Sequence, residues 1–139
     1  MADETYSGFV QRYNILIGIL LCALLTSILF SILPIVFFFI GDIYLVIGGG
    51  IGLYFTLKNK KESQSHIKTG IIVGLNGSIL SLFLIVFFDW ILYSLGQGFD
   101  LILFLNYLFY VFVANGLMYV LVGVLLGYIF GYFYRNKEV

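Results

Sequence analysis

KNKKESQSHIK, at residues 58–68, decides the fold, because it separates two long apolar segments at residues 13–57 and 69–134. The stretch holds four lysines and one glutamate. The remaining basic residues, Arg12, Arg135 and Lys137, also lie outside the apolar segments. Basic residues in short loops stay on the cytoplasmic side of a membrane. The pattern predicts a plasma-membrane protein whose central loop and two chain ends face the cytoplasm.

Composition supports a membrane location, since 62% of the 139 residues are hydrophobic and only 10% are charged. That leaves too little polar surface to cover a soluble globule. About 20 helical residues cross a hydrocarbon core about 30 Å thick, so each apolar segment accommodates two spans. We predict an all-α, polytopic four-transmembrane-helix bundle in one membrane domain, residues 1–139. The expected spans cover residues 13–33, 37–57, 69–92 and 113–134.

Two outer turns are expected between these spans. Pro34, Gly41 and Asp42 interrupt the first apolar segment, and the polar cluster from Ser94 to Asp100 interrupts the second. The chain opens with acidic rather than basic residues and continues apolar beyond the length of a signal peptide core. The first span is therefore predicted to be a retained anchor.

The aromatic segment at residues 101–112 has two interpretations. One crossing measured back from Arg135 is complete near Asn115 and Gly116, so the segment is surplus to the fourth span. It is either an interfacial or re-entrant segment on the outer side, or the first part of one long helix that bends at Asn115 and Gly116.

The chain also reads as two tandem helical hairpins. Residues 27–29 and 35–38 repeat as residues 78–80 and 85–88 with a one-residue gap. Asn59 and Asn136 each lie between two basic residues after a glycine-bearing aromatic run. A parallel repeat of this kind has its pseudo-twofold axis along the membrane normal. Chance similarity between apolar sequences is the alternative explanation.

Small residues spaced by four indicate helix packing, because they let backbones approach closely in lipid. We expect them to hold the bundle together; the alternative is that one stripe is spare and forms a homo-oligomer or docks a larger complex. Cys22 is expected either to face lipid or to pack as a small residue. The predicted helix-packing residues are Gly48, Gly52, Gly70, Gly74, Ser78, Gly123, Gly127 and Gly131.

Polar residues inside spans are the candidates for function, because they are costly there. Asn76 is expected to be buried and to bond another helix, and Asp89 is expected at the outer interface beside Trp90. A polar pathway is the alternative role for Asn76. Its expected lining consists of Thr26, Ser27, Ser31, Asn76 and Ser81.

The lysines of the central loop form a candidate site for anionic lipid headgroups, although membrane orientation alone also explains them. They are Lys58, Lys60, Lys61 and Lys68. His66 is predicted to lie exposed in the same loop, without partners for a metal site. The run Gly48–Gly52 lacks the strand, the helix start and the lysine of a phosphate loop. We expect no cofactor, no metal site and no nucleic-acid binding.

Part of the chain resembles a family of small glycine-rich four-helix membrane proteins of archaea, whose function is unknown. The resemblance is best over the second and third predicted spans and implies a four-span bundle, but it carries over no functional residue. It rests on Leu33, Pro34, the run Gly48–Tyr54, His66, Thr69, Gly70, Gly74 and Gly77.

Two functions are compatible with this pattern. With one histidine, one cysteine and no pair of membrane-embedded acids, the chain offers no catalytic constellation, so an enzyme is not expected. We favour a structural or accessory membrane protein that packs against itself or against other membrane protein subunits in the lipid. The alternative is a small channel or transporter for an ion or a small solute.

Overall fold

The computed structural model describes residues 8–33 and 41–137, and every regular element in these ranges is a helix. A short helical turn at residues 8–12 precedes the first long helix. The four long helices are α2 (Asn14–Ile32), α3 (Gly41–Lys58), α4 (His66–Gln97) and α5 (Leu101–Lys137). The all-α prediction is confirmed.

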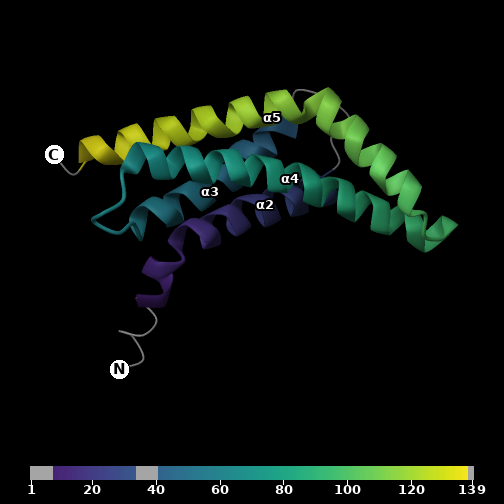
Figure 1. The fold of residues 1–139 in the computed structure, drawn as a ribbon, viewed down its shortest axis with the longest axis horizontal. Helices are drawn as coiled ribbons and strands as arrows, with labels where there is room; N and C mark the ends of the chain where they lie inside the picture. The colour runs from purple at the N-terminus through teal and green to yellow at the C-terminus, as the bar shows by residue number, and fades with distance from the viewer. Residues whose placement is uncertain (1–7, 34–40, 138–139) are drawn as a thin grey trace.

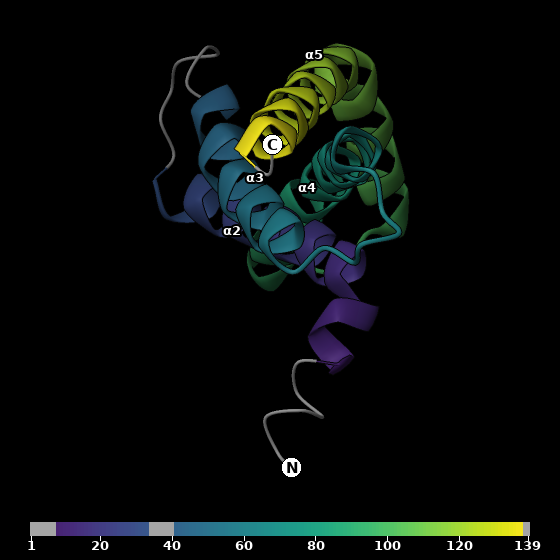
Figure 2. The ribbon, with the colours of Figure 1, turned by 90° about the vertical axis from the view of Figure 1, so that its left-hand side faces the viewer.

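The helices form a bundle of two antiparallel hairpins, α2 with α3 and α4 with α5 (Figures 1 and 2). Both α3 and α4 contact all three other helices, whereas α2 and α5 lie on opposite sides. Three of the described helices, α2, α4 and α5, are long and apolar enough to cross a membrane. The architecture is compatible with a membrane protein.

The basic residues gather at one end of the bundle. Lys58 ends α3, Lys68 lies in the first turn of α4, and Arg135 and Lys137 lie in the last turn of α5. Arg12 precedes α2. These helix ends lie at the same end of the molecule in Figure 1. Their common position is what the distribution of basic residues predicts.

Helix boundaries differ from the prediction mainly at the connection between α4 and α5. Residues 94–97, expected in a loop, are the last residues of α4, and only residues 98–100 lie outside a helix. Gly98 ends the helix with a φ of 91°, a left-handed value that favours glycine. Its N–H donates a hydrogen bond to the Ser94 carbonyl oxygen. The polar residues before it are compatible with a helix, so their clustering misled the prediction.

Residues 101–112 form the first part of α5, which is one helix from Leu101 to Lys137. This is the long-helix alternative from the sequence. Figure 1 shows that α5 changes direction between its green N-terminal part and its yellow C-terminal part. Of the first predicted outer turn, at residues 34–42, residues 34–40 lie outside the described residues, whereas Gly41 and Asp42 are the first residues of α3 and not part of a turn.

Small residues bring the backbones of α2 and α3 together. Gly18 faces Gly52 so closely that a Cβ atom on Gly52 would lie 2.5 Å from the Gly18 carbonyl oxygen. One turn farther along the hairpin, a Cβ on Gly48 would lie 2.9 Å from the carbonyl oxygen of Cys22. Real Cβ atoms essentially never come this close. Glycine is therefore required at these positions for the observed helix separation.

The second hairpin has the same construction. Gly70 and Gly127 face each other, and a Cβ on Gly74 would lie 2.8 Å from the carbonyl carbon of Gly123. At the end of the bundle, a Cβ on Gly131 would lie 2.7 Å from the His66 carbonyl oxygen. All eight predicted helix-packing residues are buried. Each of the three stripes faces another helix of the same chain.

Cys22 connects the two hairpins. Its side chain is 1% exposed, and a Cβ on Gly77 of α4 would lie 2.6 Å from its Sγ atom. On the α3 side, a Cβ on Gly49 would be 3.6 Å from the same sulfur. Of the two sequence interpretations, Cys22 is the packed small residue.

Alanine at Gly74 is expected to destabilise the bundle by about 1–3 kcal/mol, because its methyl group meets backbone that cannot move aside. The matched control is Gly96→Ala in the same helix, where a Cβ would meet nothing within 4 Å. That change should be neutral or stabilise by up to about 1 kcal/mol, since alanine favours the helix. Reversible unfolding in mixed detergent micelles measures the free energy of unfolding of both variants. Equal changes for Gly74→Ala and Gly96→Ala would contradict the close packing at Gly74.

Candidate functional site

Asn76 lies on the exposed side of α4, so the prediction that it is buried is wrong. Its Nδ2 atom donates a hydrogen bond of 2.8 Å to the Ile72 carbonyl of the same helix. The neighbouring Gly74 and Gly77 explain the error, because they turn toward α5 and α2 respectively. With two faces of α4 taken by small residues, Asn76 is left on a third face.

The structure does not bring the predicted polar pathway together. Thr26, Ser27 and Ser81 are fully buried, whereas Ser31 and Asn76 are exposed. Each of the four hydroxyls donates to a carbonyl of its own helix, at 2.6 to 3.0 Å. The three buried residues act as packed small side chains, and all four hydroxyl groups have hydrogen-bond partners.

A hydrogen-bonded amide pair fastens the central loop to the start of α2. Asn14, which is 1% exposed, donates to the Gln64 side-chain carbonyl at 3.0 Å and to the Thr56 carbonyl at 3.2 Å. Gln64 donates back to Asn14 at 3.4 Å and accepts from the Lys61 N–H at 3.2 Å. Sequence reasoning missed both residues. The only signal was a polar residue, Asn14, inside the first predicted span two residues after Arg12.

The loop lysines have different surroundings. Lys60 Nζ donates to the carbonyls of Lys61 and Gln64, at 3.0 and 2.9 Å, so it closes the loop. Lys58 and Lys68 are exposed, and the Lys58 ammonium lies 5.7 Å from the centre of the Tyr54 ring. The exposed lysines can meet anionic headgroups, whereas Lys60 is occupied within the protein.

His66 is the first residue of α4 and is half-buried, so its prediction as an exposed loop residue is wrong. The error arose because α4 begins before Lys68, with the His66 backbone packed against Gly131. His66 also lines an open pocket of about 470 Å³. The other lining residues are Lys60, Glu62 and Gln64.

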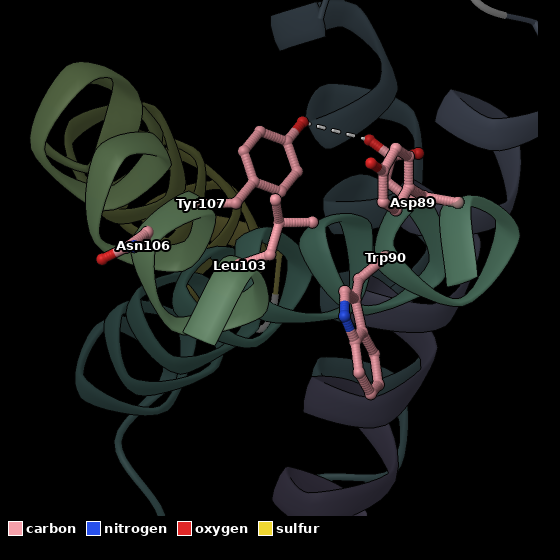
Figure 3. Close-up of a pocket in the computed structure, with 6 residues that line it drawn as sticks. Asp89, Trp90, Leu103, Asn106 and Tyr107 are labelled. Carbon is pink, nitrogen blue, oxygen red and sulfur yellow. Dashed lines mark hydrogen bonds between the residues drawn. The ribbon is translucent and has the colours of Figure 1, made fainter. Parts of the chain in front are cut away.

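The two described acids at the opposite end have separate roles. The Asp100 carboxylate accepts from the N–H groups of Ile102 and Leu103, at 2.9 and 3.2 Å, and so caps the start of α5. Asp89 is half-buried on α4 and accepts from the Tyr107 hydroxyl of α5 at 3.3 Å (Figure 3). The side chain of Asp42 lies outside the description.

No cluster of metal-ligating residues occurs within residues 8–33 and 41–137. No known protein family, no curated protein and no solved structure matches the chain. The resemblance to the archaeal family therefore stays a prediction.

The amide pair leads to a test of how the loop is held. Asn14→Ala and Gln64→Ala should each destabilise the protein, with a coupling of about 0.5–3 kcal/mol because they share hydrogen bonds. Asn59→Ala combined with Asn14→Ala is the control, since Asn59 donates to the Phe55 carbonyl of its own helix. Those two changes should add within about 0.5 kcal/mol. The free energy of unfolding is measured for all variants. If its changes are additive in both double-mutant cycles, the hydrogen bonds between Asn14 and Gln64 do not hold the loop against α2.

Proposed function

We propose that the chain is a non-enzymatic, structural or accessory membrane protein that packs one face of α4 against a helix of a partner. The partner is a second copy of the chain or another membrane protein subunit. The exposed amide of Asn76 carries this proposal. Along α4 it follows Lys68 by eight residues, about 12 Å of helix, which corresponds to a depth within the hydrocarbon core.

An amide at that depth favours a polar partner. An asparagine side chain has four positions for hydrogen bonds, and the bond to the Ile72 carbonyl uses one N–H. It is unfavourable for the remaining hydrogen-bonding positions of this amide to face lipid tails without partners. A hydrogen bond between helices in a membrane contributes about 0.6–2 kcal/mol. A partner helix beside Asn76 would provide it.

The surrounding surface suits helix packing. Ile79 and Phe83 are exposed on α4 at 39% and 38%, and they follow Asn76 by three and seven residues. This spacing places the three side chains on one stripe of the helix. The glycine stripes already face helices within the chain, so the proposed contact uses this apolar stripe with its single amide instead.

We also propose that α3 is a fourth span, with both chain ends cytoplasmic. Its 18 residues are about 27 Å long, close to the thickness of the hydrocarbon core, and no charged residue occurs from Ile43 to Leu57. Four crossings put the basic end of the bundle on the cytoplasmic side. Without a crossing by α3, Arg12 would lie on the opposite side of the membrane from the central loop.

Cysteine labelling in intact cells tests this topology. Cys22 is buried and should not react, so Gln11→Cys, Ser63→Cys and Gln97→Cys can be made singly in the native chain. An impermeant maleimide should label Gln97→Cys from outside and leave the other two unlabelled until the cells are opened. Labelling of Gln11→Cys together with Gln97→Cys from outside would contradict a crossing by α3.

Gentle extraction followed by intact-complex mass spectrometry tests the packing function. The native chain is expected in a complex heavier than its own 15.7 kDa, and Asn76→Leu should lower the abundance of that complex. Leu24→Ala is the control, because Leu24 is exposed on α2 near the level of Asn76, as the contact of Cys22 with Gly77 indicates. It should leave the complex intact. A native chain found only as a partner-free monomer would refute the proposal.

A further inference from the structure

A pocket of about 520 Å³ lies between the C-terminal part of α4 and the N-terminal part of α5 (Figure 3). Small-molecule sites in proteins typically have volumes of about 300–1,000 Å³. The function proposed above makes no use of this pocket. Its lining residues are Asp89, Trp90, Tyr93, Leu103, Asn106 and Tyr107.

The pocket contains one formal charge and no basic residue. Asp89 supplies the negative charge, and among the described residues the neutral Tyr107 hydroxyl is the one group that hydrogen-bonds its carboxylate. Lys68, the nearest basic residue along α4, is 21 residues away, about 31 Å of helix. Along the bent α5, 28 residues separate Tyr107 from Arg135, which lies in the last turn at the opposite end of the bundle. The described chain thus supplies no cation to Asp89, although a carboxylate removed from bulk water favours one.

Aromatic residues form much of the wall. Tyr93 and Tyr107 line the pocket together with Asp89, and Figure 3 shows Tyr107 reaching from α5 toward the carboxylate. Aromatic rings attract cations through the negative charge of their faces, and quaternary ammonium groups are commonly bound by such rings. A carboxylate with tyrosine rings beside it suits an organic ammonium group better than a metal ion, which requires several oxygen ligands.

The far side of the pocket is apolar and held in place. Leu103 supplies an aliphatic side chain from α5, next to Tyr107 in Figure 3. The Trp90 indole donates to the Asp100 carbonyl at 2.9 Å, and its ring centre lies 5.0 Å from that of Phe104. These contacts fix Trp90 as one wall. A ligand with an apolar part could extend from Asp89 past Leu103 toward the indole.

We infer that this pocket binds an organic ammonium ion with an apolar substituent, with its cationic group at Asp89 between Tyr93 and Tyr107. Two sources share this chemistry, a free amphiphilic amine and a phospholipid with an ammonium headgroup. Asp89 lies about one membrane thickness from Lys68 along α4, a level that both sources can reach. The site requires no partner on the Asn76 face, so the two proposals can fail separately.

Trp90 is the only tryptophan of the chain, so its fluorescence reports on the pocket directly. In a neutral maltoside detergent, hexyltrimethylammonium should change the emission saturably, whereas uncharged hexanol should not. Asp89→Asn should weaken the binding about ten-fold or more, because the charge that attracts the ammonium group is lost. Asp89→Glu retains that charge and should bind more tightly than Asp89→Asn.

Glu62→Gln is the matched control, since it removes a carboxylate from the central loop, at the opposite end of the bundle from the pocket. Because Glu62 does not line the pocket, the affinity should stay within about two-fold. Tyr93→Leu is a second test that leaves the charge in place. Loss of one aromatic wall should weaken binding about three-fold or more.

Intact mass spectrometry distinguishes the two sources. The protein is loaded with equal amounts of phosphatidylethanolamine and phosphatidylglycerol, and the retained lipid is identified. Retention of phosphatidylethanolamine by the native protein and not by Asp89→Asn assigns the site to a lipid headgroup. Saturable amine binding without that retention assigns it to a free amine. The inference is overturned if the native protein neither binds hexyltrimethylammonium saturably nor retains phosphatidylethanolamine. It is also overturned if Asp89→Asn, shown by circular dichroism to be folded, equals the native protein in amine binding and in lipid retention.

Discussion

The close approach of helix backbones at small residues is the constraint on which the rest of the structure depends. In lipid, apolar burial gives little drive for helices to associate, so packing at short range must supply it. Gly18 against Gly52 in the first hairpin, and Gly70 against Gly127 in the second, leave no room for a Cβ atom. The same device therefore builds both hairpins, whether or not they arose by duplication.

Joining the two hairpins places a second demand on α4. Gly74 faces α5, while Gly77 meets Cys22 of α2, so small residues are needed on two sides of one helix. The third side is left to larger side chains and to Asn76. The exposed amide is thus a consequence of how α4 is used inside the bundle, and it is also the feature that favours a partner.

The two ends of the bundle differ in chemistry as well as in charge. At the basic end, the amide pair of Asn14 and Gln64 ties the loop to α2, and Lys60 closes it. At the opposite end, α4 and α5 enclose an aromatic pocket around Asp89. Separation of the basic residues from this acid leaves its carboxylate available to a cation from outside the chain.

Hydropathy, the distribution of basic residues and glycine spacing were sufficient to predict the helical class, the approximate helices and the common end of the positive charges. These features are local, because helix length and charge depend on neighbouring residues in the chain. The side of α4 that carries Asn76, the contact of Cys22 with Gly77 and the pocket between Asp89 and Tyr107 depended on the tertiary structure. Helical spacing shows which residues share a face, but only the packing of two hairpins decides which partner each face meets.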